Sequence, residues 1–225
     1  MAKVLDKGYV EFVESWGSEE RIIEAARMST NKGFVNWDED AKLLAYLYNH
    51  KHMTPFEMAG MVLEVKAPIM VFREWHRHRT MSYNEMSARY VPLPNDDYLP
   101  TIERLMLGAN TATTNKQAQG LGTELSEHDA MDWLYMLEDV YNHCQIVYEC
   151  GLKLGIPKEL ARLPVTVGRY SRMRVSCNLR NWLAFLTLRQ DSAAQYEIRV
   201  YADEVCKLIA EHFPRTEALF SKSAQ

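Results

Sequence analysis

The sequence lacks any uncharged apolar run near the roughly 18 residues that a bilayer-spanning helix needs. Residues 1–6 also lack the apolar segment of a secretory signal. Only 4 of the 225 residues are cysteine, and no pair of them has the C-x-x-C spacing of a zinc site or of a thioredoxin-like redox pair. These absences predict a cytoplasmic protein whose cysteines are reduced thiols.

The common nucleotide-binding and hydrolase motifs are also missing. The chain has no G-x-G-x-x-G, no G-x-x-x-x-G-K-[ST], no H-E-x-x-H and no G-x-S-x-G. These absences exclude a Rossmann fingerprint, a P-loop, a zincin site and a nucleophile elbow. If a nucleotide or a flavin binds here, we expect arginine side chains rather than a glycine-rich backbone loop to hold its phosphates.

The charge of the chain is distributed unevenly. The net charge is −4, yet residues 162–189 contain six arginines and no lysine, aspartate or glutamate, a local net charge of +6. Residues 73–90 carry four arginines against two glutamates, a local net charge of +2. Because a guanidinium binds phosphate and carboxylate groups through paired N–H donors, these stretches indicate shaped sites for anionic ligands. The alternative, that the arginines pair with acidic side chains elsewhere in the fold, stays open.

The apolar patterning predicts an α+β fold. With 47% apolar and 11% aromatic residues, the composition fits one folded domain over 1–225 and excludes disorder. Stretches with helical periodicity outnumber those with strand alternation, and the strands are too few for a doubly wound parallel sheet. We therefore expect a small, mostly antiparallel sheet packed with several α-helices. The polar segment around 108–123 has no apolar period and predicts a loop.

Two of the helix starts predicted in the first half of the chain contain proline. Residues 54–57, Thr-Pro-Phe-Glu, have the pattern of a capping box with proline at the first helical position. Pro68 is expected to begin a second helix. Because residues four apart share a helical face, this helix would present Arg73 and Arg77 together.

The second half is expected to hold a strand followed by two helices. Residues 165–176 alternate like a strand that presents a basic edge. Asn178 is expected to cap a helix over 179–189. Asp191 is expected to cap the last long helix, which would end before Pro214.

Residues 75–90, WHRHRTMSYNEMSARY, are the most informative stretch of the sequence. They gather arginines, hydroxyl side chains, an amide and a carboxylate within one short segment. Arginine and serine suit phosphate oxygens, while Asn84 and Glu85 suit a ribose or the edge of a heterocycle. No metal site is predicted, because His76 and His78 lie among arginines that would repel a dication.

A motif in this stretch resembles a known family. Arg77-His78-Arg79 followed by seven residues and Ser87 is similar to the signature of the flavin-dependent thymidylate synthases. Further segments resemble the same family in the same order, at residues 5–8, 50–57, 65–69, 178–180 and 188–195. The resemblance therefore covers nearly the whole chain.

The resemblance implies the reductive methylation of dUMP to dTMP. In that reaction 5,10-methylenetetrahydrofolate gives the carbon, and FAD reduced by NADPH carries the hydride. The resemblance also implies a homotetramer whose sites are shared, with Arg162 and Thr54 coming from subunits other than the one that gives Ser87. No nucleic acid and no membrane is expected as a partner. All of these ligands are anionic, which agrees with the arginine-rich stretches.

Matching positions give the residues that the resemblance assigns to each ligand. The deoxynucleotide would contact Glu74, Trp75, His76, Arg77, Glu85, Met86, Ser87, Ala88, Arg89, Arg162 and Arg189. FAD would contact Thr54, Arg77, His78, Arg79, Glu85, Asn178, Arg180 and Arg189, with His52 near the flavin and the folate. Two positions depart from the family pattern, because some members have glutamine in place of Glu74 and some have asparagine or histidine in place of Ala184.

Arg189 resembles the activating arginine of the family and is the expected catalytic residue. A guanidinium beside the pyrimidine stabilises the anion that forms when the ring nitrogen between the two carbonyls loses its proton. Electron density then reaches carbon 5, which attacks the methylene carbon without a cysteine nucleophile. Cys177, the only cysteine near a site segment, is interpreted as a small buried residue because no adjacent group acts as its base.

Two other functions stay open on the sequence. The first is a non-catalytic RNA or DNA binder that uses basic residues 169–174 and stacks bases on Tyr170, although the net charge of −4 counts against it. A purified flavoprotein would show bound-flavin absorbance, whereas such a binder would carry nucleic acid. The second is another reaction on a pyrimidine nucleotide, such as hydroxymethylation, which the mass of the product would distinguish.

Overall fold

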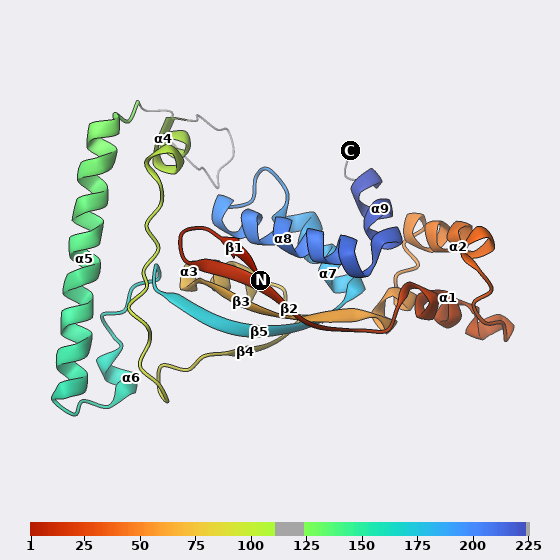
Figure 1. Ribbon diagram of the computed structural model, residues 1–225, viewed down its shortest axis with the longest axis horizontal. Coiled ribbons are helices and arrows are strands. Elements are labelled where there is room, and N and C mark those ends of the chain that lie inside the picture. The colour runs from red at the N-terminus through yellow and green to blue at the C-terminus, as the bar shows by residue number, and fades with distance from the viewer. Residues whose placement is uncertain (111–123, 224–225) are drawn as a thin grey trace.

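The computed structural model describes residues 1–110 and 124–223 (Figure 1). Within this part of the chain, five antiparallel strands form one sheet in the order β1-β2-β3-β5-β4. The strands are β1 (Ala2–Val4), β2 (Gly8–Trp16), β3 (Gly60–Pro68), β4 (Ser82–Glu85) and β5 (Tyr170–Asn178). The antiparallel sheet and the helices packed on it confirm the predicted α+β fold.

The helices surround the sheet on one side and at both ends. They are α1 (Glu19–Arg27), α2 (Trp37–Asn49), α3 (Ile69–Trp75), α4 (Ile102–Asn110), α5 (Glu127–Lys153), α6 (Lys158–Ala161), α7 (Leu179–Arg189), α8 (Tyr196–His212) and α9 (Pro214–Ser223), with 3-10 helices η1 (Met28–Thr30) and η2 (Thr54–Met58). Figure 1 shows α7 and α8 along one side of the sheet, α1 and α2 at one end of the molecule, and the long α5 at the other.

The core lies between the sheet and the helices α7 and α8. Along β3, Met61, Leu63 and Val65 are fully buried, whereas Val62 and Glu64 between them are partly exposed. This period of two is the pattern of a strand with one buried face. Burial of an apolar side chain of this size contributes about 1.5–3 kcal/mol, so the sheet is held mainly by this one face.

An aromatic cluster fixes the end of α3 against α7. Trp75, the last residue of α3, is fully buried and stacks on Phe185 of α7 with 4.7 Å between the ring centroids. Trp182 and Tyr201 meet the same indole ring edge-on. The residues that follow Trp75 are therefore held beside α7, where the candidate site forms.

The helix predicted at residues 54–57 is wrong, and the helix predicted to begin at Pro68 is confirmed as α3 but ends earlier than expected. Residues 54–57 do not form a capping box, because Thr54 lies inside η2 and the N-cap residue Met53 makes no side-chain cap hydrogen bond. The chain turns into β3 directly after η2, which leaves no length for an α-helix. Helix α3 ends at Trp75, so Arg77 lies in the turn beyond it and shares no helical face with Arg73.

The basic strand is an interior strand rather than an edge. β5 lies between β3 and β4, and the described edge on that side is β4, which was not predicted. In the register of this pair, Ser82 lies opposite Ser176 and Asn84 lies opposite Arg174. The four residues of β4 are polar and partly or fully exposed, so they carry none of the apolar alternation by which a strand is recognised.

Of the two helices predicted after β5, the first begins where it was expected and the second begins later. Asn178 caps α7 as predicted, since its Oδ1 accepts a hydrogen bond of 3.0 Å from the main-chain N–H of Asn181. Asp191 instead caps a turn, where its Oδ1 accepts from the N–H of Ala193 at 2.7 Å, and α8 starts later. Helix α8 ends at His212, before Pro214 as predicted, and Pro214 then opens α9, because proline fits the first turn of a helix.

Helix α5 stands at one end of the molecule (Figure 1). Three side-chain hydrogen bonds tie it to the body, joining Tyr141, Gln145 and Tyr148 to Tyr98, Arg169 and Leu93, respectively. Residues 108–110 of the predicted polar loop belong to α4, and residues 111–123 lie outside the described residues. None of the described helices has the length and apolarity needed to cross a membrane.

Candidate active site

Arg189, in the last turn of α7, is the centre of a hydrogen-bonded cluster. Its Nε donates to Nε2 of His78 at 2.9 Å, and its Nη1 donates to Oε2 of Glu74 at 2.7 Å. Its Nη2 donates to the main-chain carbonyl of Glu74 at 2.8 Å. The side chain is only 14% exposed, so its position is well defined. These bonds use three of the five N–H donors of the guanidinium, and no described residue accepts from the other two.

His78 acts in this cluster as a neutral acceptor. Burial and the neighbouring Arg189 charge lower the pKa of His78 to about 4, against a smaller opposing effect of Glu74. The imidazole is therefore uncharged at neutral pH, and because Nε2 accepts from Arg189, the ring proton is on Nδ1. The edge of the ring also packs on Phe185, with 4.9 Å between the centroids.

Tyr83 of β4 holds the turn that carries the Arg-His-Arg triplet. Its hydroxyl lies 2.9 Å from the carbonyl oxygen of Trp75 and 2.8 Å from that of His78, and donates its proton to this pair of acceptors. Burial raises the pKa of Tyr83, so the hydroxyl stays protonated. Arg77 and Arg79 are exposed, and none of the described carboxylates lies within ion-pair distance of either. The turn therefore offers two unpaired cations next to the Arg189 cluster.

A separate cavity of about 280 Å³ forms beyond the end of β4. Glu85, Met86 and Ala88 line it together with Arg162 and Ser171. Arg162 is exposed at the C-terminal cap of the short helix α6. The cavity thus combines a cation, a carboxylate and small side chains.

The two residues next to this cavity are held by short-range contacts. Ser87 Oγ accepts a hydrogen bond of 3.3 Å from the N–H of Arg89, and Arg89 pairs with Glu159 of α6 at 3.3 Å. Arg162 therefore lies with the segment around Ser87 in one chain. The expectation that different subunits supply Arg162 and Ser87 to one site stays a prediction.

Some of the residues assigned to FAD lie at the other end of α7, whereas the Arg77-His78-Arg79 triplet lies beside Arg189. Asn178 and Arg180 lie in its first turn, and Arg180 forms an ion pair with Glu57 of η2. Thr54 and His52 are exposed at and just before η2. Eleven residues rise about 1.5 Å each, so this group and Arg189 lie about 15 Å apart along the helix. Ala184 lies between them on the exposed side of α7.

Two predicted nucleotide contacts lie in different environments. The side chain of Trp75 is 0% exposed in the aromatic cluster, and its carbonyl accepts from Tyr83, so any contact of Trp75 with a ligand falls to its main chain. His76 is exposed and meets the ring of Tyr83 edge-on, with 4.7 Å between the centroids. Both assignments stay predictions.

Arg169 and Tyr170, which the sequence left open as nucleic-acid contacts, have structural roles. Arg169 is 1% exposed and donates to Asp97 at 3.1 Å. Tyr170 is 0% exposed, and its hydroxyl donates to Asp6 at 2.5 Å. The proposed base-stacking platform on Tyr170 is therefore wrong.

The exposed face of the sheet carries polar residues other than those assigned to the nucleotide or the flavin. Arg172 and Arg174 lie beside Glu64 at 3.9 and 3.0 Å, and both guanidinium groups are more than half exposed. Ser82 and Ser176 line the same hollow of about 500 Å³. The alternation of residues along β5 indicated this basic face, but not its neighbours from β4.

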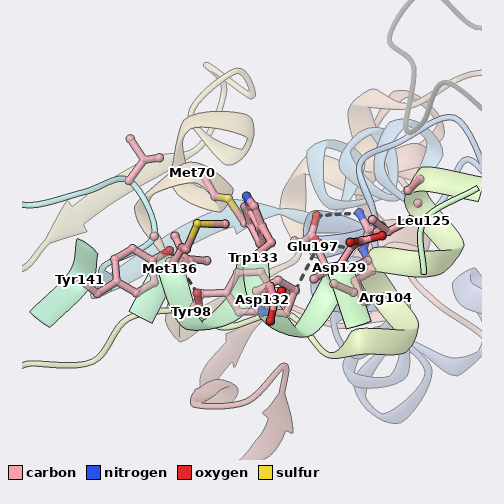
Figure 2. A pocket seen from close by; sticks show the side chains of 18 residues that line it. Met70, Tyr98, Arg104, Leu125, Asp129, Asp132, Trp133, Met136, Tyr141 and Glu197 are labelled. Atoms are coloured by element: carbon pink, nitrogen blue, oxygen red, sulfur yellow. Dashed lines mark hydrogen bonds and ion pairs between the residues drawn. The ribbon is translucent and has the colours of Figure 1, made fainter. Parts of the chain in front are cut away.

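A larger cavity of about 850 Å³ lies between α4 and α5 (Figure 2). Trp133 and Met136 of α5 and Met70 of α3 form its apolar wall. Its charged end is the ion pair of Arg104 and Glu197, with 2.9 Å between Nε and Oε1. The lining contains none of the residues that the sequence assigned to the nucleotide or the flavin.

Comparison with known proteins shows the family. Residues 11–215 match the family described as thymidylate synthase complementing protein. The flavin-dependent thymidylate synthase of Ehrlichia ruminantium (strain Gardel) is 39% identical over 221 residues, covering 97% of this chain and 72% of that protein. The enzyme of the same name from Anaplasma marginale (strain St. Maries) is 40% identical over 218 residues, covering 97% and 73%.

A solved structure agrees in fold. The UMP/dUMP methylase PolB from Streptomyces cacaoi, bound with 5-Br dUMP, superposes with a TM-score of 0.86 at 30% identity, over 98% of this chain and 97% of that chain. The chain belongs to the flavin-dependent thymidylate synthase family.

Proposed function

We propose that the protein methylates dUMP to dTMP, with 5,10-methylenetetrahydrofolate as the carbon donor and FAD reduced by NADPH as the hydride carrier. The observation that carries this proposal is the Arg189 cluster, in which a well-held guanidinium keeps two N–H donors free. Family membership supports the substrates and the cofactor. The PolB structure bound with 5-Br dUMP supports a uracil nucleotide as the ligand of this fold.

The residues along α7 fit an extended dinucleotide such as FAD. The N-terminus of this eleven-residue helix carries Arg180, and its main-chain N–H groups favour an anion. Arg77 and Arg79 add cations with no acidic partner among the described residues. In this proposal FAD is held by Thr54, Arg77, His78, Arg79, Glu85, Asn178 and Arg180, with His52 near the flavin and folate.

The cavity of Arg162 fits the phosphate and sugar of the nucleotide. Arg162, Arg89 and the hydroxyl of Ser87 suit the phosphate oxygens, because charge-assisted hydrogen bonds to phosphate are strong. The carboxylate of Glu85 suits a sugar hydroxyl, which donates to it. No residue is shared between this cavity and the Arg189 cluster, which supports a site completed by two subunits.

In this site Arg189 stabilises the pyrimidine anion. Its two free N–H donors match the deprotonated ring nitrogen and an adjacent carbonyl oxygen as a planar pair. Hydrogen bonds to His78 and Glu74 fix the guanidinium of Arg189 before the reaction starts. The side chain therefore needs little rearrangement when the pyrimidine anion forms. The ring anion places electron density on carbon 5, which makes the new carbon–carbon bond.

The test of this function is an anaerobic reaction of the protein with reduced flavin, dUMP and 5,10-methylenetetrahydrofolate. We expect the mass of the methylated nucleotide in the product. A hydroxymethylated nucleotide would show a different reaction on the same substrate. Protein that is purified without flavin absorbance, and that makes no modified nucleotide when FAD is added, contradicts the proposal.

Replacing Cys177 with alanine is expected to leave turnover within a few-fold of the wild-type rate. The thiol is 3% exposed, and burial raises its pKa to about 12, so it is neutral and closed to substrate at neutral pH. The substitution removes a small core group, so it lowers the stability of the fold and leaves the rate of the chemical step nearly unchanged. Steady-state turnover of the folded, flavin-bound variant checks this. Loss of all turnover in that variant would show that a cysteine takes part.

We also propose a homotetramer, supported by the apolar surface of α5. Residues exposed on this helix include Trp133, Tyr135, Met136, Val140, Ile146 and Val147. An apolar surface of this extent is uncommon on a monomer and is typical of an interface. The hollow between α4 and α5 continues the same surface, since Trp133 and Met136 belong to both (Figure 2).

Replacing Ile146 with aspartate is expected to dissociate the oligomer and to lower activity with it. Ile146 is 64% exposed in the isolated chain, so the change costs the monomer little but places a charge in an apolar interface. Asn142→Asp, at an exposed polar position of the same helix, is the matched control. Light scattering measures the mass of each species. A wild-type protein that is fully active as a monomer at high dilution contradicts both the tetramer and the shared site.

A further inference from the structure

We propose that the hydroxyl of Tyr83 is a positioning group for Arg189 and acts on it through His78. The inference rests on the proposed function, in which Arg189 stabilises the pyrimidine anion, and it adds a residue of β4 to the groups on which that step depends. It follows from a chain of contacts that runs from β4, through the turn after α3, to the last turn of α7.

The turn that carries His78 is held only partly by its own main chain. Its starting point is fixed, because the side chain of Trp75 is 0% exposed and stacks on Phe185. The N–H of His78 donates to the carbonyl of Trp75 at 2.9 Å, whereas the carbonyl of His78 accepts from the N–H of Met81 at a longer 3.3 Å. The main chain therefore holds His78 through one well-formed and one long hydrogen bond.

Tyr83 supplies a further contact to this turn. Its hydroxyl is 2.8 Å from the carbonyl oxygen of His78 and 2.9 Å from that of Trp75, so it ties His78 to the fixed end of α3. The register of the sheet places the side chain there, because Tyr83 lies opposite Val175, whose side chain is fully buried on the helix-covered face. Removal of the hydroxyl would leave the ring in place and free the turn.

His78 transmits this position to Arg189. Nε2 of His78 accepts from Nε of Arg189 at 2.9 Å, and the other two bonds of the guanidinium both go to Glu74. His78 is thus the acceptor that fixes the guanidinium from its second side. A shift of the turn would rotate this group and misdirect its two free N–H donors, and a misplacement of about 1 Å can cost a reaction about two orders of magnitude in rate.

The protonation of His78 reports on the same contact. Only the neutral ring accepts from Arg189, because a protonated imidazole has no free lone pair and carries a like charge. Burial and the Arg189 charge lower the pKa of His78 to about 4. The titratable and charged groups around it are Arg189 of α7, Glu74 of α3, Tyr83 of β4, and Arg77 and Arg79 of its own turn. A loosened turn would admit water to the ring, so the pKa of His78 should rise toward the ordinary histidine value of about 6.5.

The decisive variant is Tyr83→Phe, which removes the hydroxyl and keeps the ring. With FAD and both substrates at saturation, we expect single-turnover methyl transfer at neutral pH to slow by about tenfold, the upper end of what one hydrogen bond contributes. The affinity for dUMP should change little, because the phosphate and the sugar are proposed to bind in the cavity of Arg162. The matched control is Tyr201→Phe, which removes a bond of 2.7 Å to the main-chain carbonyl of Lys66 and should keep the wild-type rate.

A double-mutant cycle separates action through His78 from a general loss of stability. His78→Ala removes the acceptor for Nε of Arg189 and should slow methyl transfer at least as much as Tyr83→Phe does. If Tyr83 acts through His78, adding Tyr83→Phe to His78→Ala should slow the reaction little further.

Titration of the histidine rings by NMR gives a second measurement that needs no turnover. The signal that is missing from the His78→Ala spectrum identifies His78. Its pKa should be higher in Tyr83→Phe than in the wild type, and unchanged in Tyr201→Phe. The loss of rate in Tyr83→Phe should accordingly grow as the pH is lowered from 7.5 toward about 5.5, since His78 then gains a proton in the variant and stays neutral in the wild type.

Three results overturn the inference. Wild-type methyl transfer in Tyr83→Phe shows that the hydroxyl has no part in the reaction. An equal fractional loss in the wild-type and His78→Ala backgrounds shows that Tyr83 supports the fold and does not act through His78. A slower Tyr83→Phe protein in which His78 keeps its low pKa shows the same. Wild-type protein that forms no methylated product contradicts the proposed function instead, while the NMR titration still tests whether Tyr83 controls the position of His78.

Discussion

Replacing Arg189 with alanine is expected to lower the rate of methyl transfer by about two orders of magnitude or more, the scale of losing one preorganised charge-stabilising donor. The guanidinium matters most when the pyrimidine carries negative charge, so the loss falls on the chemical step. Flavin binding should persist, because Asn178 and Arg180 lie at the far end of α7. Reduction of the flavin by NADPH should proceed at the wild-type rate.

Arg189→Lys should be almost as inactive, although it keeps the charge. The three bonds of Arg189 to His78 and Glu74 depend on a planar group with donors in fixed directions, and an ammonium group cannot reproduce them together with a free pair for the substrate. Stopped-flow measurements resolve the reductive and the methyl-transfer half-reactions in both variants. If flavin reduction slowed alone while methyl transfer kept its rate, Arg189 would belong to the cofactor site and the assigned role would fail.

The elements that the sequence predicted well are those fixed by local signals. Asn178 caps α7 as predicted, through its side-chain oxygen and the N–H three residues later. The alternation of residues 165–176 likewise predicted β5, whose alternate residues Met173 and Val175 face the core. Such elements depend on neighbours in the chain, which a sequence displays directly.

The elements that were missed depend on distant partners. β4 is recognised only by its pairing with β5, which lies far along the chain, because its own residues are polar. The expected helical register of Arg77 failed for a similar reason. The hydroxyl of Tyr83 donates to the main-chain carbonyls of Trp75 and His78. The chain therefore forms a tight turn there and the helix does not continue.

The candidate site was predicted as a set of residues, and not as an arrangement. The Arg-His-Arg pattern identified His78, but its contact with Arg189 spans 111 positions of sequence. Charge alone did not rank the six arginines of 162–189, and only the resemblance singled out Arg189. In the structure Arg189 lies in the hydrogen-bonded cluster, Arg162 lines a cavity and Arg169 is buried in an ion pair with Asp97. Charge density indicates an anion site, while burial and partners decide which arginines take part.

Replacing Asp97 with alanine is expected to lower the free energy of unfolding by about 3–5 kcal/mol, because it leaves the Arg169 cation buried without its counter-charge. Arg169 is 1% exposed and Asp97 7% exposed, and their atoms Nε and Oδ1 are 3.1 Å apart. Thr166 also donates to Oδ1 of Asp97, at 3.4 Å. The change therefore breaks a buried pair and frees a hydroxyl on the segment just before β5.

Asp97→Ala should also weaken nucleotide binding, because Arg169 connects three segments of the chain through its hydrogen bonds. Its Nη1 donates at 2.8 Å to the carbonyl of Pro94 and at 2.8 Å to Gln145 of α5. The segment that it anchors, residues 162–170, begins with Arg162 in the cavity proposed for the phosphate. Displacing this segment moves a proposed phosphate ligand without touching Arg189, so the loss should be seen in the affinity for dUMP rather than in the rate of methyl transfer at saturation.

Urea unfolding at one fixed protein concentration measures the stability effect, because an oligomer's apparent stability depends on concentration. Glu24→Ala, which breaks the exposed pair with Arg21, is the matched control and should cost less than about 1 kcal/mol. Asp97→Asn keeps an acceptor for Nε but removes the charge, so we expect a loss between those of the control and Asp97→Ala. An Asp97→Ala protein as stable as the control would mean that water reaches Arg169 and solvates it, and the buried pair would then contribute nothing to holding the Arg162 segment in place.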